Sequence, residues 1–344
     1  MDSRELVRRA IEFQGPSRIP LRYSFDPGRS DIVGIGYHPA KGWTPWVPGE
    51  DEFGCVWDTL EGRVISSFGQ VKDSPIKSWD EYENYRFPDP HAEGRFEGLA
   101  KAIEHHRSKG KYIVGSMGFH GFNRMMFLRG AENLLMDLVL NHGMVKKLAD
   151  DLMQWEMAII SDYLELGVDG VWFGDDWGTQ RGLFISPSLW REIFKPLYKA
   201  QFDLIHQHGK HVLFHSCGYV WDIIGDFIEI GVNALNLNQP NIFGNENVSG
   251  IDRLAENFGG KVCFICPVDM QTTLIAGTEE DIRKEAKHLV SALGRYNGGF
   301  IACCDEGIDH GYIPIKRIRL MGKAFEEFAW PDYQVKVWRP RSIQ

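Results

Sequence analysis

Residues 167–218 have the sequence GVDGVWFGDDWGTQRGLFISPSLWREIFKPLYKAQFDLIHQHGKHVLFHSCG, which contains one strand–helix–strand repeat. The apolar run 167–176 ends in two aspartates and predicts a buried strand. The stretch 186–209 begins with Ser-Pro, a typical N-cap and first helical residue, and ends in Gly, so it predicts a long helix. The apolar run 210–218 predicts the next strand. Strands this apolar are typical of parallel sheets that helices cover on both faces.

The same alternation continues to the end of the chain. Further strands are expected at 111–117, 234–239, 261–269 and 298–307, and further helices at 220–231, 251–259, 279–294 and 315–329. A loop and a helix are expected after the strand 111–117, up to about residue 165. With a strand at 17–25, seven to eight strand–helix units fit the 344 residues. The pattern therefore predicts a single domain over 1–344, an α/β fold of the (β/α)8 TIM barrel class with an N-terminal extension. An open doubly wound sheet is the alternative, but no Gly-rich dinucleotide fingerprint follows the first strand.

The N-terminal part of the chain has a different character. A helix is expected at 1–15, where apolar residues recur at helical spacing. Residues 26–90 are rich in Gly, Pro and aromatic residues, including Trp43, Trp46 and Trp57, and have little helical periodicity. Long irregular segments in compact proteins usually serve as lids or small subdomains. We therefore expect 26–90 to form an extension that covers the barrel mouth.

Composition excludes some classes of partner. The formal net charge is −9 and no basic run is present, which disfavours nucleic acid and anionic membranes. The sequence shows neither a signal-peptide pattern nor an apolar run of about 20 residues, so a cytoplasmic location is expected. Six cysteines in a chain of this length do not form a disulfide scaffold, and metal binding or nucleophilic chemistry is the commoner use of such thiols in the cytosol.

Catalytic side chains of a TIM barrel lie at the carboxyl ends of its strands. Asp175 and Asp176 follow an apolar strand directly, and paired carboxylates can act as base, metal ligand or substrate anchor. Either one could instead cap the following segment. His120, in the loop GFHGF after the strand 111–117, is a further catalytic candidate, although an ordinary loop histidine is equally compatible with the sequence.

The most specific chemical element is His215-Ser216-Cys217-Gly218. Side chains two residues apart on a strand point to the same side, so His215 and Cys217 should face the same space. Imidazole nitrogen and thiolate sulfur are preferred Zn²⁺ donors, and catalytic zinc sites keep one position open for substrate. Taken alone, a His-x-Cys pair is also compatible with a histidine that caps the barrel and a cysteine that packs as a small apolar side chain.

The last predicted strand, with the sequence CCDEG at 303–307, offers a third ligand. Cys304 and Glu306 share one face of the strand, and either one would complete a zinc site with the His-x-Cys pair. Cys303, on the other face, is a weaker candidate. The spacing of Cys263 and Cys266 points them to opposite faces of a strand, so both are expected in the core.

Several stretches together resemble the uroporphyrinogen decarboxylase superfamily and, within it, the zinc-dependent, corrinoid-linked methyltransferases. The resemblance extends over nearly the whole chain. It depends on SRELVRRAIEFQGPSRIPL, DEFGCVWDTLEG, DEYENYRFPDP, GVDGVWFGDDWGTQRGLFISPSLWREIFKP, HVLFHSCGYV, VDMQTTLIAGTEEDIRKE and GGFIACCDEGI. These motifs are specific to the superfamily but say little about the substrate. The methyltransferase branch includes methylcobalamin:coenzyme M methyltransferases and components of methoxyarene O-demethylases.

The resemblance implies a (β/α)8 barrel, often a homodimer, with a tetrapyrrole or corrinoid partner at the barrel mouth. It also implies a zinc ion held by the His-x-Cys pair and by a cysteine of the last strand. Alignment of the last strand places Glu306 at that third position, a departure from the pattern. The decarboxylases carry Arg-Gln-Ala-Gly-Arg after the first strand, whereas the matching LRYSFDPGR has only Arg22 and Arg29. Binding of eight porphyrinogen carboxylates would require several well-placed arginines.

We therefore expect a zinc-dependent methyltransferase that exchanges a methyl group between a small substrate and a corrinoid protein. The substrate would be a methoxylated aromatic compound or a thiol. The corrinoid (cobalamin) would come from a separate protein, since the sequence lacks an Asp-x-His-x-x-Gly cobalamin-ligand motif. The alternatives are a decarboxylase of a tetrapyrrole or related carboxylic acid, a zinc hydrolase on the same scaffold, and a non-catalytic tetrapyrrole or corrinoid carrier.

Overall fold

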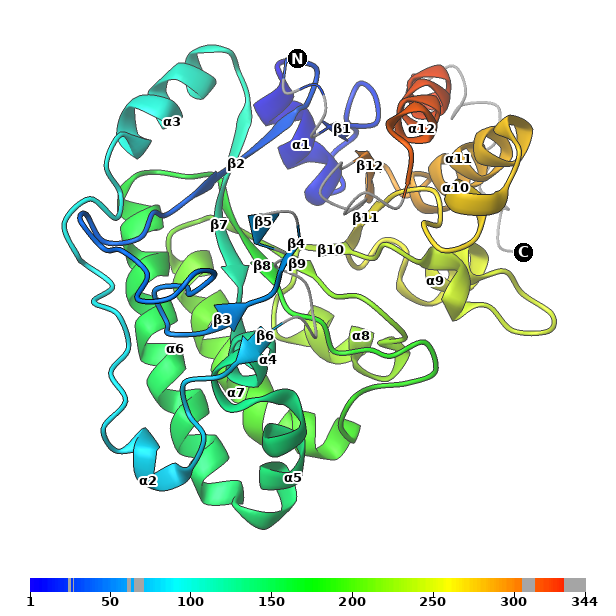
Figure 1. Cartoon of the computed structure of the whole chain (residues 1–344). Coiled ribbons are helices and arrows are strands. Elements are labelled where there is room, and N and C mark those ends of the chain that lie inside the picture. The colour runs from blue at the N-terminus through cyan, green and yellow to red at the C-terminus, as the bar shows by residue number, and fades with distance from the viewer. Residues whose placement is uncertain (24–25, 27, 61–62, 65–70, 305–312, 331–344) are drawn as a thin grey trace.

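Eight parallel strands form the centre of the molecule in the computed structural model, which describes residues 1–23, 26, 28–60, 63–64, 71–304 and 313–330. In spatial order the strands are β1 (Leu21–Tyr23), β12 (Phe300–Cys304), β11 (Cys263–Cys266), β10 (Ala234–Asn236), β9 (His211–His215), β8 (Gly170–Gly174), β7 (Tyr112–Phe119) and β2 (Ile32–Gly36). Each pairs in parallel with its neighbours in this order (Figure 1).

The sheet curves until its two outer strands, β1 and β2, lie side by side. The backbone N–H of Asp31, just before β2, donates to the carbonyl of Leu21 at 2.8 Å. The N–H of Tyr23 donates to the hydroxyl of Ser30 at 3.1 Å. These bonds bring the two edges of the sheet together, and the predicted (β/α)8 TIM barrel is thereby confirmed.

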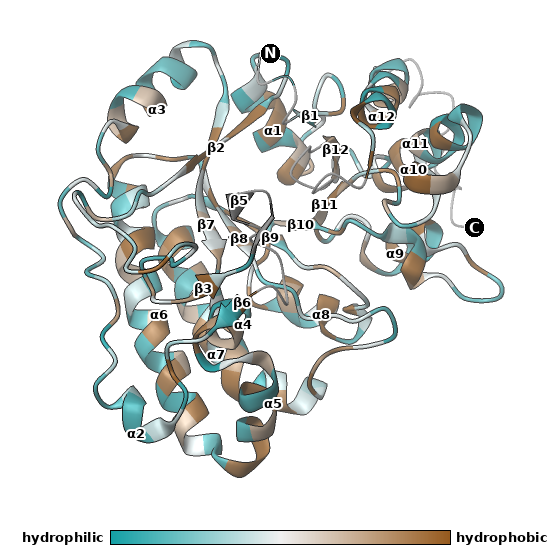
Figure 2. Cartoon of the chain, in the orientation of Figure 1, coloured by the Kyte–Doolittle hydropathy of each residue, from teal (hydrophilic) through white to brown (hydrophobic). Residues whose placement is uncertain are grey.

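Helices surround the barrel. They are α3 (Leu99–Ser108), α4 (Gly121–Arg129), α5 (Ala131–Leu140), α6 (His142–Glu165), α7 (Pro187–Gln207), α8 (Trp221–Glu229), α9 (Gly250–Phe258), α10 (Thr273–Ala276), α11 (Glu279–Leu293) and α12 (Ile315–Phe328), with a short 3₁₀ turn η1 (Pro240–Phe243). Hydrophobic and hydrophilic residues alternate along α6 and α7 in Figure 2, as expected for helices with one face on the barrel. Ser186 accepts a hydrogen bond from the N–H of Leu189 and so caps α7 as predicted.

Strand alternation separates two apolar layers. The side chains that face the barrel interior form one cluster, made by Ile32, Tyr112, Val114, Leu213, Ala234, Cys263, Ile265, Ile301 and Cys303 with Val7, Ala10 and Ile11 of helix α1 (Ser3–Ile11). Helix α1 therefore closes one end of the barrel. The alternate strand positions belong to a second cluster, between the strands and the outer helices. Cys263 lies in the inner cluster and Cys266 in the outer one, so both are core residues, as predicted.

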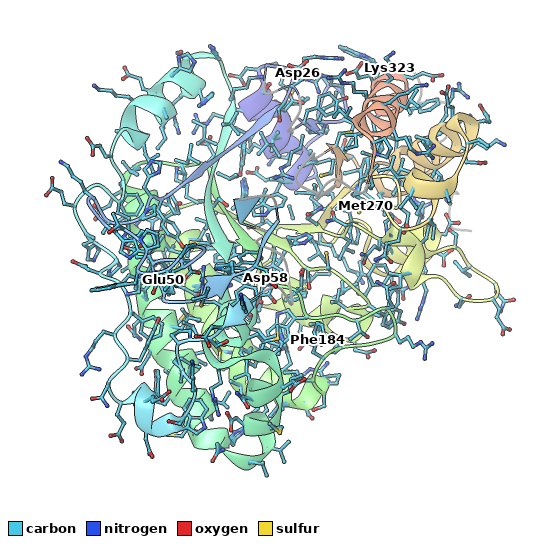
Figure 3. The ribbon with its side chains drawn as sticks, viewed as in Figure 1. Asp26, Glu50, Asp58, Phe184, Met270 and Lys323 are labelled. Carbon is cyan, nitrogen blue, oxygen red and sulfur yellow. The ribbon has the colours of Figure 1, made fainter. Side chains whose placement is uncertain are left out.

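In the described residues between β2 and α3, the helices and strands are short. They are β3 (Val56–Trp57), β6 (Val71–Asp73), β4 (Thr59–Leu60), β5 (Arg63–Val64) and α2 (Trp79–Tyr82); β3 pairs with β6, and β4 with β5. In Figure 1, strand β7 starts near α1, at one end of the barrel, and points toward β3 and β6. Figure 3 shows the side chains of Glu50 and Asp58 on this segment.

Buried ion pairs hold this segment in place. Arg95, whose side chain is fully buried, pairs with Glu52 at 2.8 Å and also donates to the carbonyls of His38 and Asp89. Arg124 of α4 pairs with Asp51 at 3.0 Å. The segment is thus joined to a barrel helix by a charged contact as well as by apolar packing.

Two local features differ from the sequence expectations. Strand β2 lies inside 26–90 and belongs to the barrel, because its five residues, IVGIG, pair with β7 along their whole length. Two glycines had weakened its strand signal. The region from about 120 to 165, expected as a loop and a helix, contains three helices, α4 to α6. The prediction of one domain over 1–344 remains a prediction.

None of the helices in the described ranges combines the length and the apolar character needed to cross a bilayer.

Candidate metal centre and active site

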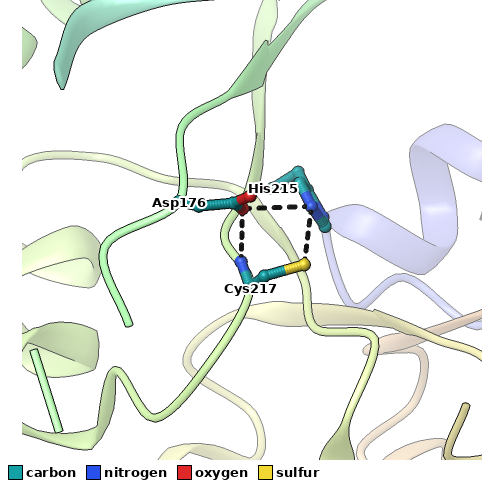
Figure 4. A group of neighbouring side chains, drawn as sticks. All are labelled: Asp176, His215 and Cys217. Atoms are coloured by element: carbon teal, nitrogen blue, oxygen red, sulfur yellow. Dashed lines mark hydrogen bonds and ion pairs between the residues drawn. The ribbon is translucent and has the colours of Figure 1, made fainter. Parts of the chain in front are cut away.

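The loops after β8 and β9 bring three potential metal ligands together: Asp176, His215 and Cys217 (Figure 4). The sulfur of Cys217 lies 3.4 Å from Nε2 of His215, and an Asp176 carboxylate oxygen lies 3.4 Å from the same nitrogen. One donor atom from each residue fits within 4.8 Å of the others. No other such group of three occurs in the described part of the chain. The side chains of His215 and Cys217 thus face the same space, as strand alternation predicts.

These distances fit the donor geometry of zinc. Zinc–nitrogen, zinc–oxygen and zinc–sulfur bonds of about 2.0–2.3 Å at tetrahedral angles separate donor atoms by about 3.4–3.6 Å. Imidazole, thiolate and carboxylate are all zinc ligands, and three protein ligands leave the fourth position for substrate. The three side chains are only partly buried, so a small molecule can reach them.

A neighbouring amide fixes the orientation of the imidazole. Nδ1 of His215 lies 2.7 Å from Oδ1 of Asn236, a buried residue of β10. The amide group of Asn236 donates to the carbonyl of Ile265 at 2.6 Å, so its oxygen is the acceptor. Nδ1 of His215 therefore carries a proton, and Nε2 is directed at Cys217 and Asp176. Histidines that bind metals usually have an acceptor of this kind on their second nitrogen.

The charges of the cluster are mutually dependent. Burial lowers the pKa of His215, but Cys217 and Asp176 together raise it well above its usual value. Burial raises the pKa of the Cys217 thiol, which the histidine partly counteracts. Burial raises the pKa of Asp176, yet hydrogen bonding to His215 brings it below its usual value. Proton and metal compete for such ligands, so a cation between them would displace the proton shared by imidazole and carboxylate.

Close backbone contacts fix the two loops that carry the ligands. The N–H of Cys217 donates to the Asp176 carboxylate at 2.7 Å, and the N–H of Gly218 donates to the side chain of Gln239 at 3.0 Å. Gly218 has a φ of +80°, and a Cβ there would lie 2.1 Å from the carbonyl oxygen of Gly178. The turn after His-x-Cys therefore requires glycine.

The other two predicted catalytic residues, Asp175 and His120, face the outer helices and not the ligand group. Asp175 is fully buried and accepts the backbone N–H groups of Phe122 and Asn123. Burial raises the pKa of Asp175 to about 7. His120 is also fully buried, with Nε2 2.9 Å from Gln201 and 3.1 Å from the carboxylate of Glu156. Both side chains are bonded to outer helices rather than to the metal-type cluster, and their catalytic roles remain predictions.

The predicted third ligands come from β12. Cys304 is fully buried in the apolar cluster outside the barrel, whereas its neighbour Cys303 belongs to the inner cluster. Cys304 thus lies on the face of its strand opposite to the one that His215 occupies on β9. Glu306 lies outside the described residues, so its predicted role as a ligand stays a prediction. Asp176, expected from the sequence as a catalytic residue, is the third donor that the described residues bring to His215 and Cys217.

A cleft of about 510 Å³ lies at the same end of the barrel as this site, between the extension and the carboxyl ends of β2 and β7. Its lining combines aromatic residues, among them Trp43, Trp57 and Phe119, with the charged residues Glu50, Asp51, Glu52 and Arg124. Trp57 stacks on Phe119, with ring centres 5.7 Å apart. Arg124 follows Asn123, whose side chain accepts the N–H of Asp176 at 3.2 Å. The cleft and the ligand group are therefore connected through α4.

Sequence reasoning missed Asn236 and Asn123. Asn236 lies within the predicted strand 234–239 and not at its carboxyl end, where catalytic side chains are expected. It could have been found as an amide on the inward face of an otherwise apolar strand, ALNLN. Asn123 has no comparable signal, because its role depends on how α4 packs against the end of β8.

Comparison with known families gives one match. Residues 63–328 match the family described as uroporphyrinogen decarboxylase (URO-D). No curated protein sequence matches this chain significantly.

Solved structures share the fold at low sequence identity. A structure described as a methyltransferase from Methanosarcina mazei is 14% identical, with a TM-score of 0.64, and the alignment covers 95% of this chain and 99% of that one. A GH18 chitinase ChiB of Flavobacterium johnsoniae is 10% identical over 91% of this chain and 95% of its own, with a TM-score of 0.43. At 14% identity the similarity to the methyltransferase structure shows the fold alone.

Proposed function

Because the chain belongs to the uroporphyrinogen decarboxylase family, we propose that it is a zinc-dependent methyltransferase that exchanges a methyl group between a small substrate and a corrinoid protein. The observation that carries the proposal is the convergence of Asp176, His215 and Cys217 within 4.8 Å. The methyltransferase structure of the same fold supports it. The corrinoid would belong to a separate protein that docks at the barrel mouth, and the enzyme itself would be a homodimer.

The residues of the site have distinct tasks in this proposal. Bound zinc supplies Lewis acidity, which activates a thiol or polarises an ether oxygen. His215 and Cys217 bind the ion, and Asn236 keeps Nε2 of His215 directed at it. The third protein ligand is a carboxylate, either Asp176 or Glu306. Asp176 also accepts the N–H of Cys217 and thereby fixes the loop that carries the sulfur.

The cleft favours the methoxylated aromatic substrate over the thiol. Trp43 and Phe119 are partly exposed in the lining, so a substrate ring can pack against them, and such aromatic contacts contribute about 0.5–1.5 kcal/mol each. Two of the three carboxylates of the lining are paired with cations, Asp51 with Arg124 and Glu52 with Arg95, while Glu50 accepts the backbone N–H of Trp46. A predominantly uncharged ring with a methoxy substituent suits such a cleft.

The decarboxylase alternative has less support. A porphyrinogen substrate requires several arginines aimed at the barrel mouth. Of the two near the matching segment, Arg29 pairs with Glu326 of α12, and Arg22 stacks on Trp172 inside the barrel at 4.2 Å. Release of CO2 from a tetrapyrrole substrate would favour this alternative.

Metal analysis of the purified protein tests the proposal. After growth with sufficient zinc, we expect about one zinc per chain, which His215→Ala should abolish. His208→Ala is the matched control, because His208 is an exposed histidine at the end of α7, remote from the cluster in the fold. Wild-type protein that contains no zinc and binds none on titration would refute the proposal.

The third ligand is tested by comparing single variants. Asp176→Ala, Glu306→Ala and Cys304→Ala would be titrated with zinc in competition with a chromophoric chelator. We expect a loss of zinc affinity in Asp176→Ala, in Glu306→Ala or in both, and none in Cys304→Ala. A loss in Cys304→Ala alone would contradict the carboxylate assignment.

The group-transfer reaction is tested by the visible spectrum of a corrinoid protein. With reduced corrinoid protein, a methoxylated aromatic compound should produce the methylated form and the free phenol. A spectral change with a thiol and methylated corrinoid protein, but not with any methoxyarene, would overturn the substrate preference. No change with either class of substrate would refute methyl transfer.

A further inference from the structure

Asp175 is the neighbour of Asp176 in sequence but faces away from the ligand group. Its side chain is fully buried. Oδ1 accepts the backbone N–H of Asn123 at 2.8 Å, and Oδ2 accepts that of Phe122 at 3.0 Å together with the hydroxyl of Tyr198. Its oxygens thus bind the first turn of helix α4 and the middle of helix α7.

The first turn of α4 needs this acceptor. The helix starts at Gly121 after His120, whose side chain makes no capping hydrogen bond. The first N–H groups of a helix have no partner within the helix, and a carboxylate at that end is stabilised by the helix dipole. Asp175 supplies the missing acceptor from another part of the chain and takes the place of a local N-cap.

Asn123, in the same helical turn, holds Asp176. Its side-chain oxygen accepts the backbone N–H of Asp176 at 3.2 Å, and Asp176 in turn accepts the N–H of Cys217 at 2.7 Å. Asp175 therefore fixes α4 with its carboxylate, and α4 fixes the backbone of the next residue. The contact is tight, because a Cβ on Gly121 would lie only 2.5 Å from Oδ2 of Asp175.

We propose that Asp175 is a positioning residue: by capping α4 it sets the orientation in which Asp176 meets His215 and Cys217. Asp175 itself contacts neither metal nor substrate. The inference rests on the proposed function, because it assumes that the site binds a metal. It concerns a separate property, namely how much zinc affinity depends on the fixed position of Asp176. Residues that support metal ligands in this way typically change metal affinity by about 10- to 100-fold.

Zinc affinity of Asp175→Asn tests the proposal. Asparagine has the same shape, but its NH2 group cannot accept the helix N–H groups. We expect zinc to bind about 10- to 100-fold more weakly in competition with a chromophoric chelator. Asp137→Asn is the matched control, since Asp137 is also a buried aspartate with strong partners, Arg129 and Asn141, but lies on α5. Both variants should lose stability, and only Asp175→Asn should lose zinc affinity.

A spectroscopic measurement distinguishes a changed arrangement of the metal ligands from a general loss of protein stability. The visible absorption of Co²⁺ bound in place of zinc depends on the arrangement of its ligands, so it should change in Asp175→Asn and not in Asp137→Asn. If Asp175→Asn does not fold, Asn123→Ala removes only the bond to the Asp176 backbone and should show the same change in spectrum and a loss of affinity.

The outcomes distinguish the two claims. Zinc bound equally well by wild type, Asp175→Asn and Asn123→Ala would overturn the positioning role and leave the proposed function intact. Equal loss of zinc affinity in Asp175→Asn and Asp137→Asn would also overturn it, because the effect would then follow stability alone. Wild-type protein without any zinc affinity would overturn both.

Discussion

At the level of single side chains, the candidate site depends on how each donor is oriented rather than on which donors are present. His215 can bind a cation through Nε2 only while Nδ1 holds the proton that Asn236 accepts. Asn236 keeps that role because its own NH2 group is committed to the carbonyl of Ile265. The amide therefore selects the tautomer of the imidazole and limits its rotation.

Removal of this amide should weaken metal binding. In Asn236→Ala, His215 loses the acceptor on Nδ1, and zinc affinity is expected to fall about 10- to 100-fold in a chelator competition. Asn233→Ala is the control, since Asn233 makes similar bonds, to His206 and to the N–H of Val212, at the opposite end of the barrel. An unchanged zinc affinity in Asn236→Ala would show that the amide does not orient the ligand.

At the level of elements, α4 joins the parts of the candidate site. Consecutive residues of its first turn make different contacts: Asn123 holds the backbone of Asp176, and Arg124 pairs with Asp51 of the extension. The close approach of α4 to the end of β8 is possible only because its first residue is Gly121, with a φ of +52°. A side chain there would collide with Asp175 and Tyr198.

Gly121→Ala should therefore destabilise the protein. The left-handed backbone costs about 1–2 kcal/mol for a residue with a Cβ, and the collision adds to this cost. The free energy of unfolding, measured by urea denaturation, should fall by more than that amount. Gly143→Ala is the matched control, because a Cβ at Gly143 of α6 would meet nothing within 4 Å. It should raise stability by about 0.5–1 kcal/mol. Equal effects of the two changes would contradict the structure.

The contact between α7 and α8 should depend on pH. Asp226 of α8 is nearly buried and pairs with Arg191 and Lys195 of α7. Burial raises the pKa of Asp226, but the two cations outweigh it and hold the pKa below its usual value. Because the carboxylate is more acidic in the folded state, its stabilisation is present above the unfolded pKa of about 4 and is lost as pH falls through the folded value.

Asp226→Asn is expected to lower the free energy of unfolding by about 1–2 kcal/mol at pH 7. The difference from wild type should shrink in urea denaturation as pH falls through the lowered folded pKa of Asp226, because the carboxylate then becomes uncharged. Asp203→Asn, at an exposed ion pair with Lys199 on α7, is the control and should change stability little at either pH. A difference that persists at low pH would show that the charge of Asp226 is not its source.

At the level of the whole molecule, a buried charge holds distant parts of the extension together. Arg95 is fully buried and joins Glu52 to the carbonyls of His38 and Asp89, three points far apart in the segment. A buried charge without its partner is costly, so such a pair stabilises a defined arrangement more than it adds to overall stability. The extension therefore has a defined conformation against the barrel and can form one wall of the cleft.

Arg95→Met should release this segment. The unpaired carboxylate of Glu52 would cost about 3–5 kcal/mol of stability and make the aromatic residues of the extension accessible to chymotrypsin. The control is Lys41→Met, which breaks the exposed pair with Glu93 and should cost no more than about 1 kcal/mol. If the double variant Arg95→Met/Glu52→Leu is as unstable as Arg95→Met, the unpaired charge is not the cause.

The barrel could be predicted from the sequence because most of its strands and helices carry a local signal. Apolar runs such as 210–218 alternate with helices that begin at caps such as Ser186, and a parallel sheet covered by helices follows from that order. The convergence of His215 and Cys217 is also local, since residues two apart on a strand share a face. These features depend on side-chain patterns that repeat every two to four residues, and such patterns are visible in the sequence itself.

Other features depend on contacts between distant residues. The strand β2 has two glycines among five residues, and its pairing with β7 makes it a barrel strand. Asp176 joins His215 and Cys217 because neighbouring strands β8 and β9 end at the same level. The inward position of Asn236 beside His215 follows from strand register, and the capping of α4 by Asp175 follows from packing across 50 residues. Register and packing are set by the summed burial of the whole core, so no short stretch of sequence encodes them.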